Sequence, residues 1–165
     1  MYIININKMM NQISDKVYLG NFLSAKDENN LIKNNINRVL SCLGYCTLKY
    51  NNESIQHKIL DLDDTSDTNI IQYFKEALKF IDESDKILVH CLCGVSRSAT
   101  IVIAYFMWKN KLTYDESFSK VSECRIVSPN LGFIKQLEIF EDKLKEFDYD
   151  LDKIDFQNIK WPIVE

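Results

Sequence analysis

The sequence predicts an α/β fold, in which helices cover the faces of a central sheet. Two observations carry this prediction. Short apolar runs of strand length alternate with segments whose apolar residues recur at helical spacing, and several helical segments follow one another late in the chain. The chain has 165 residues, close to the size of one domain. Apolar residues make up 46% of it and charged residues 27%, which suits one folded core and excludes overall disorder.

Local patterns assign the individual elements. Four apolar runs predict strands, at residues 16–19, 38–42, 56–60 and 86–90. Four further segments predict helices, at residues 68–82, 98–109, 113–123 and 130–146. The helix over 98–109 is apolar on nearly every side, so we expect it to be buried. Thr113 and Glu116 form a capping box at the start of the third helix.

Charge, apolar runs and cysteine spacing exclude several classes of protein. The net charge of -4 lacks the basic excess typical of nucleic-acid-binding proteins. The longest apolar runs fall far short of the roughly 18 residues that a membrane span needs, and the first residues lack a signal-peptide pattern. The five cysteines show no framework spacing, so we expect free thiols in a reducing compartment, the cytoplasm or the nucleus. Neither nucleic acid nor a membrane is an expected partner.

Three scarce residue types gather in one short stretch. The chain has 4 Gly, 2 His and three Arg, and Gly94, His90 and Arg97 fall within eight positions. Cys91 stands at the end of a predicted strand, and five residues separate it from Arg97, where the buried helix begins. Such a loop can turn its backbone N–H groups inward at a helix N-terminus and hold a tetrahedral oxyanion. We call residues 91–97 the signature loop.

The residue types of the signature loop suit phosphoryl transfer. Gly94 leaves the backbone free in the middle of the loop, and the guanidinium of Arg97 can grip two oxygens at once. Cys91 faces this positive field, so its thiol pKa should lie well below the free value of about 8.5. Taken singly, Cys91 or His90 could equally be a packed core residue. The joint pattern favours a nucleophile.

The reaction also needs a proton donor for the leaving oxygen. Four carboxylates precede the helix predicted at 68–82, namely Asp61, Asp63, Asp64 and Asp67. An Asp held over the pocket would contribute about 10²–10⁴-fold to the rate. Spacing alone does not choose among the four, and a solvated turn with a helix cap is the alternative for any one of them.

The stretch from His90 to Thr100 resembles the signature of the cysteine-dependent protein phosphatases, in particular their small atypical dual-specificity branch. Residues 17–21, 73–82 and 124–137 resemble further blocks of that family. The resemblance implies a phosphotyrosine phosphatase-like fold, with a central mixed, largely parallel sheet of about five strands flanked by helices. It divides the chain into an N-terminal extension (1–13), a catalytic domain (14–146) and a C-terminal tail (147–165), which we expect to be loosely docked and whose role is unknown.

The resemblance also implies roles for single residues. Cys91 attacks phosphorus to give a cysteinyl-phosphate intermediate, and Ser98 steadies the thiolate as it leaves. Asp64 corresponds to the general acid, ten residues before Phe74, with Asp63 as the neighbour that an alignment could confuse with it. His90 supports Cys91 by hydrogen bonding. The expected substrate-binding residues are Leu92, Cys93, Gly94, Val95, Ser96, Arg97 and Arg125.

The expected substrates are phosphorylated proteins, kinases among them, carrying phosphotyrosine or phosphoserine and phosphothreonine. Leu92, Cys93 and Val95 stand where inositol-lipid phosphatases carry basic residues, which favours protein substrates. Arg125 is expected to meet a second phosphate, a surface arginine being the alternative. No metal or cofactor is expected. Alternatives for the whole chain are a silent phosphoprotein-binding pseudophosphatase, a phosphatase of a non-protein ester and a rhodanese-type sulfurtransferase. Cys42 is the candidate for a redox disulfide with Cys91, with core packing as its alternative.

Overall fold

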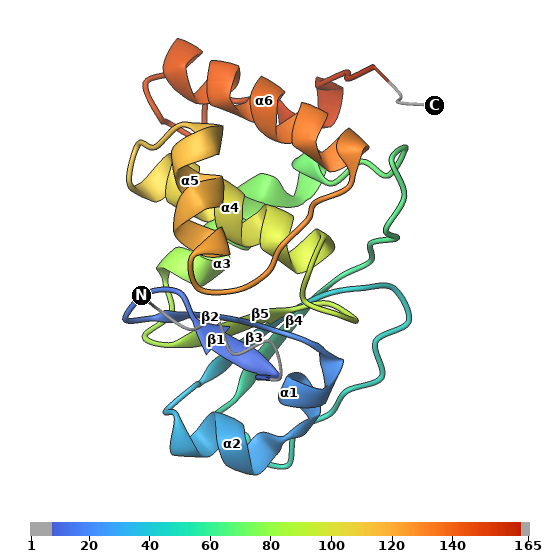
Figure 1. The fold of residues 1–165 in the computed structure, drawn as a ribbon, viewed down its shortest axis with the longest axis vertical. Helices are drawn as coiled ribbons and strands as arrows, with labels where there is room; N and C mark the ends of the chain where they lie inside the picture. Colours follow the sequence, from blue (N-terminus) through green and yellow to red (C-terminus); the bar gives the residue numbers. More distant parts are fainter. Residues whose placement is uncertain (1–7, 163–165) are drawn as a thin grey trace.

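A five-stranded sheet runs through the middle of the computed structural model, which describes residues 8–162 (Figure 1). Its strands are β1 (Met10–Gln12), β2 (Val17–Gly20), β3 (Arg38–Cys42), β4 (Gln56–Leu60) and β5 (Ile87–His90). They lie in the order β1-β2-β5-β3-β4. The β1 strand runs antiparallel to β2, and the other pairs are parallel. The prediction of a mixed, largely parallel sheet is confirmed.

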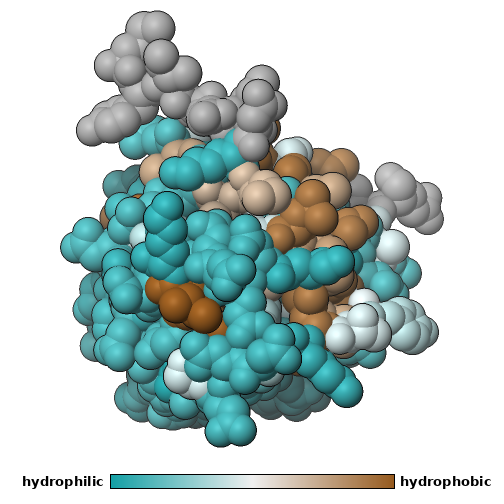
Figure 2. All heavy atoms as spheres, turned by 90° about the horizontal axis from the view of Figure 1, so that it is seen from below, coloured by the Kyte–Doolittle hydropathy of each residue, from teal (hydrophilic) through white to brown (hydrophobic). Residues whose placement is uncertain are grey.

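Helices cover both faces of the sheet (Figure 1). The short helices α1 (Phe22–Lys26) and α2 (Glu28–Lys33) lie on one face. The other face carries α3 (Phe74–Asp82), α4 (Arg97–Lys109), α5 (Tyr114–Ser122) and α6 (Leu131–Glu146). Seen from the side of α1 and α2, the surface is mainly hydrophilic, with hydrophobic side chains gathered in limited areas (Figure 2). The sheet is therefore shielded from solvent on this side as well.

Side chains of the central strands alternate between two cores. Leu40 and Val89 pack toward the large helices, whereas Val39 and Leu88 belong to the smaller core with α1 and α2. This alternation is the ordinary period of a strand. All of residues 98–107 in α4 are buried, so the prediction of a buried helix is confirmed. No helix among residues 8–162 has the length and apolar character needed to cross a membrane.

The start of one predicted helix differs from the structure. The helix expected over 68–82 begins later, as a 3-10 turn at Ile71–Tyr73 that leads into α3. Its start is set from afar, because Gln136 Oε1 accepts hydrogen bonds from the backbone N–H groups of Ile70 and Ile71, both at 3.0 Å. Within the stretch expected as an N-terminal extension (1–13), residues Met10–Gln12 form β1, which pairs with β2. Residues 1–7 lie outside the described part.

The C-terminal tail is packed rather than loosely docked. Leu151, Ile154 and Phe156 are each no more than 5% exposed and belong to the large core. The indole N–H of Trp108 in α4 donates to the carbonyl oxygen of Tyr149 at 3.0 Å. The expectation of loose docking was wrong. These apolar side chains follow no helical or strand period, yet they join the large core, where the ring of Phe156 lies 5.9 Å from that of Phe140 in α6.

Candidate active site

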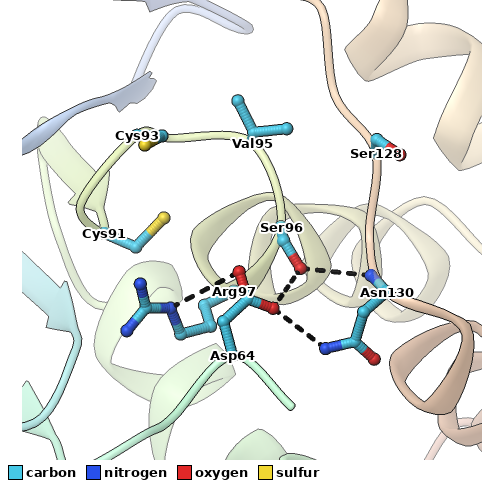
Figure 3. A pocket seen from close by; sticks show the side chains of 8 residues that line it. All are labelled: Asp64, Cys91, Cys93, Val95, Ser96, Arg97, Ser128 and Asn130. Atoms are coloured by element: carbon cyan, nitrogen blue, oxygen red, sulfur yellow. Dashed lines mark hydrogen bonds and ion pairs between the residues drawn. The ribbon is translucent and has the colours of Figure 1, made fainter. Parts of the chain in front are cut away.

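The signature loop leaves the end of β5 and leads directly into α4, in the middle of the sheet. Residues that line the pocket above it are Asp64, Cys91, Cys93, Val95, Ser96, Arg97, Ser128 and Asn130 (Figure 3). They come from three segments, which are the signature loop, the loop after β4 and the loop before α6. Ligand sites of parallel α/β sheets commonly lie at this edge, beyond the carboxyl ends of the strands.

Gly94 gives the loop its shape. Its φ is +70°, in the left-handed region that glycine adopts at little cost. A Cβ atom at this position would lie 2.3 Å from the carbonyl oxygen of Gly20 at the end of β2. The loop is therefore pressed against the neighbouring strand, and only glycine fits there. The backbone N–H of Gly94 then points back at Cys91 Sγ, 3.2 Å away.

The thiol of Cys91 is buried at the base of the pocket and is held by hydrogen-bond donors. Ser98 Oγ donates to Cys91 Sγ at 3.1 Å, in addition to the Gly94 N–H. Burial raises the pKa of Cys91, but hydrogen bonds from the hydroxyl and backbone of Ser98 and from the backbone of Gly94 and Val95 outweigh it. The net effect lowers the pKa below its ordinary value. This shift favours the thiolate, which is the nucleophilic form of cysteine.

Arg97 supplies fixed positive charge beside this sulfur. Its Nη1 donates to the carbonyl oxygen of Leu62 at 3.1 Å, which anchors the guanidinium to the loop after β4. Its Nε is buried, has no hydrogen-bond partner among the described residues and lies 3.9 Å from Asp64 Oδ2. A buried guanidinium N–H without a partner is costly to leave unsatisfied. An oxyanion in the pocket would satisfy it.

Of the four aspartates considered from the sequence, only Asp64 lines the pocket. Asp64 Oδ1 accepts hydrogen bonds from Ser96 Oγ at 2.7 Å and from Asn130 Nδ2 at 2.9 Å (Figure 3). Asp63 is exposed and is not among the lining residues. Asp67 accepts instead from the hydroxyl of Thr65, within its own turn.

Asn130 is a pocket residue that sequence reasoning missed. Its side chain caps α6, where Oδ1 accepts from the backbone N–H of Phe133 at 3.0 Å, while Nδ2 donates to Asp64. Its own backbone N–H donates to Ser96 Oγ at 3.1 Å. The available signal was an asparagine directly after Pro129, at the start of a helix, which indicates a cap but not a contact with the pocket.

Arg125 lies against the outside of the signature loop. Its Nε donates to the carbonyl oxygen of Gly94 at 2.9 Å and its Nη2 to that of Cys93 at 3.0 Å. Its Nη1 donates to Lys8 O at 3.1 Å and to Asn11 Oδ1 at 2.8 Å. Arg125 thus ties the loop to the β1 region, a supporting contact that the sequence did not predict. Binding of a second phosphate by Arg125 stays a prediction.

Two further predicted residues lie directly beneath the loop. His90 is fully buried, and burial is the main cause that lowers its pKa to about 4, so its ring is neutral. Its Nδ1 lies 3.2 Å from the carbonyl oxygen of Cys91. Cys42 is buried, and burial followed by the charge of Cys91 raises its pKa. All five cysteines are free, and the Cys42–Cys91 disulfide stays a prediction.

Comparison with known proteins agrees with this geometry. Residues 17–143 match the family described as Dual specificity phosphatase, catalytic domain. Dual specificity protein phosphatase 22 of Xenopus laevis is 40% identical over 136 residues, which are 79% of this chain and 64% of that protein. MAP kinase phosphatase with leucine-rich repeats protein 1 of Dictyostelium discoideum is 39% identical over 138 residues, 81% of this chain and 16% of that protein. The chain thus spans less than two thirds of the length of either.

Solved structures agree as well. The human tyrosine phosphatase-like serine/threonine/tyrosine-interacting protein has a TM-score of 0.77 and 33% identity, and the match covers 82% of this chain and 97% of that one. A leucine rich repeat and phosphatase domain containing protein from Entamoeba histolytica has a TM-score of 0.74 and 27% identity, covering 84% and 94%. Each match thus covers more than four fifths of this chain.

Proposed function

The chain belongs to the dual specificity phosphatase family, and from this we propose that it hydrolyses phosphate monoesters on proteins, at tyrosine and at serine or threonine. One observation carries the proposal. The Cys91 sulfur, held by the N–H of Gly94 and the hydroxyl of Ser98, shares a pocket with the unpartnered Nε–H of Arg97. A nucleophile and an anion site are therefore adjacent.

In the first step, the Cys91 thiolate attacks phosphorus, so that an S–P bond forms while the bond from phosphorus to the leaving oxygen breaks. The Nε–H of Arg97 and the backbone N–H groups of residues 92–97 bind the three remaining phosphate oxygens. These donors are fixed before the substrate arrives, because the loop is held from outside by Arg125 and from β2 by the close approach at Gly94.

Asp64 is the proposed general acid. Its Oδ1 already accepts two hydrogen bonds, so we assign the proton to Oδ2, on the Arg97 side of the carboxyl group. That proton goes to the leaving alkoxide or phenoxide. Asp63 stays the alternative from the sequence, and its absence from the pocket lining argues against it.

In the second step, water attacks the cysteinyl-phosphate and gives its proton to the Asp64 carboxylate, now the general base. The S–P bond breaks and inorganic phosphate leaves. The departing thiolate receives the hydrogen bond from Ser98 Oγ, which already spans 3.1 Å in the free enzyme. These protein groups complete both steps by themselves.

Protein phosphates are the proposed substrates. The residues that line the pocket include one arginine and no lysine. A single phosphate therefore has a cationic partner there, whereas the further phosphates of a polyphosphorylated headgroup would have none among these lining residues. One relative is named a MAP kinase phosphatase, which makes phosphorylated kinases candidates. We further propose a reducing compartment, the cytoplasm or the nucleus, and the five free cysteines support it.

The test compares hydrolysis and binding. The wild type, Cys91→Ser and Cys46→Ser are assayed on an aryl phosphate, on phosphotyrosine and phosphothreonine peptides and on an inositol phosphate. Cys46 is half-buried and lies outside the pocket lining, so its variant is the matched control. We expect Cys46→Ser to match the wild type and Cys91→Ser to lose turnover of the peptides. Phosphopeptide binding without turnover by the wild type, or a preference for the inositol ester, would contradict the proposal.

A further inference from the structure

A line of three polar side chains crosses the sheet beneath the signature loop, outside the pocket itself. It consists of His57 on β4, Ser41 on β3 and His90 on β5. Ser41 Oγ lies 2.7 Å from His57 Nε2 and 2.5 Å from His90 Nε2. The register explains the contact, because Ser41 pairs with His90 directly and His57 pairs with Val39, two residues earlier on the same face of β3.

The donor and the acceptor of each hydrogen bond in this line can be deduced from the carbonyl oxygen of Cys91, where the line ends. The carbonyl oxygen of Cys91 can only accept, so His90 Nδ1 carries a proton. The His90 ring is neutral, so its Nε2 holds a lone pair and accepts from the Ser41 hydroxyl. That hydroxyl has a single proton, now used. The contact with His57 therefore requires the Nε2–H of His57 to donate to Ser41 Oγ.

We propose that His57 is a positioning residue, whose Nε2–H orients the Ser41 hydroxyl and thereby holds His90 in its Nδ1–H tautomer. The proposal rests on the proposed function, since it concerns the backbone at the nucleophile. Through His90, the line holds the carbonyl of Cys91, the first residue of the signature loop. His57 thus supports the loop without contacting the substrate.

The opposite tautomer of His90 shows why this matters. With the proton on Nε2, the lone pair of Nδ1 would face the carbonyl oxygen of Cys91 across 3.2 Å, and the two would repel. The start of the loop would then shift. Cys91 Sγ would move away from the Gly94 N–H and the Ser98 hydroxyl, the donors that help to lower its pKa. Loss of the line should therefore raise the pKa of the Cys91 thiol.

Aromatic packing holds the ring of His57 in place. The ring of Tyr50 meets it edge-on, with ring centroids 5.3 Å apart, and the Tyr50 hydroxyl donates elsewhere, to Ala25 O at 2.9 Å. On the other side of the line, the ring of Phe22 in α1 lies 6.3 Å from that of His90. Tyr50→Phe is therefore a matched control, because it keeps the ring beside His57 and leaves the line intact.

The test measures two quantities that need no phosphate hydrolysis. The first is the tautomer of His90, read from its ring 15N chemical shifts. The second is the rate of Cys91 alkylation by iodoacetate between pH 5 and 9. We expect His57→Phe to populate the Nε2–H tautomer and to slow alkylation at pH 6 about three- to tenfold, the worth of one hydrogen bond. His57→Gln keeps an N–H donor, so it should retain most of the Nδ1–H tautomer of His90 and most of the wild-type alkylation rate. Tyr50→Phe should match the wild type in both.

Combining variants shows whether His57 acts through Ser41 or independently of it. Ser41→Ala removes the central hydroxyl, so adding His57→Phe to it should slow alkylation no further. A His57→Phe effect that persists in the Ser41→Ala background, or wild-type tautomer and alkylation in His57→Phe, would overturn the proposal. Because neither readout depends on turnover, failure of the proposed phosphatase activity would appear separately, in the Cys91→Ser assay.

Discussion

The hydroxyl of Ser96 donates a 2.7 Å hydrogen bond to Asp64, and this bond joins the signature loop to the loop after β4. Asn130 donates to the same oxygen from the start of α6. The carboxyl group is therefore oriented by two segments besides its own. It keeps Oδ2 toward Arg97, at the mouth of the pocket that holds Cys91. The proposed acid is thus placed before a substrate binds.

Replacing this acid should lower the rate, because the leaving oxygen would lose its proton donor. We expect Asp64→Asn, which is nearly isosteric, to lower kcat about 100-fold or more. The measurement is kcat with an aryl phosphate. Asp63→Asn is the control. If Asp63→Asn lowered kcat more than Asp64→Asn, Asp63 would be the general acid instead.

Removing the Ser98 hydroxyl should weaken the thiolate in a pH-dependent way. Ser98 helps to lower the pKa of Cys91, so Ser98→Ala should raise that pKa and leave less thiolate near neutral pH. A hydrogen bond to a charged group is worth about 1.5–3 kcal/mol, which predicts alkylation about tenfold slower or more at pH 6. The deficit should vanish at alkaline pH, where both proteins are ionised. Ser122→Ala, in α5, serves as control, and equal alkylation of all three proteins at pH 6 would contradict the role.

A substitution at Arg125 can distinguish whether this residue supports the signature loop or binds a second phosphate of the substrate. Lysine cannot donate to the separate carbonyls of Gly94 and Cys93 and to β1 at once. We therefore expect Arg125→Lys to lower the free energy of unfolding by about 1–3 kcal/mol. It should also lower kcat/KM on singly and doubly phosphorylated peptides alike.

The matched control is Arg38→Lys, because Arg38 lies at the amino end of β3 and donates to Phe80 O of α3, whereas the signature loop follows the carboxyl end of β5. This variant should lose stability without a selective loss of kcat/KM. Unchanged stability of Arg125→Lys, with a defect confined to doubly phosphorylated peptides, would instead support the second-phosphate role.

The packed tail should contribute to stability. Phe156 is 4% exposed, and its ring lies 5.9 Å from that of Phe140 in α6. Phe156→Ala should lower the free energy of unfolding by about 3–5 kcal/mol, because it leaves a cavity beside α6. Urea unfolding measures this, with the exposed neighbour Gln157→Ala as control. A change below about 0.5 kcal/mol in both variants would restore the expectation of a loosely docked tail.

The sequence by itself determined the parts that depend on near neighbours along the chain. Four of the strands, the buried helix α4 and the loop from Cys91 to Arg97 could be predicted from local patterns, because strand and helix periods and the Cys-x5-Arg spacing span few residues. The parallel arrangement of the strands was implied only by the family resemblance. The capping box at Thr113 was predicted for the same reason and is present in the structure.

Only the tertiary structure decided among residues that are distant in sequence. Asp64 stands out from its neighbouring aspartates because Ser96 and Asn130 donate to it. Arg125 supports the loop because Lys8, just before β1, and Asn11, within β1, supply two of its acceptors. The line from His57 to His90 exists because the strand order places β3 between β4 and β5. Such contacts depend on how the sheet is ordered and packed, so they cannot be predicted from the spacing of hydrophobic residues along the chain.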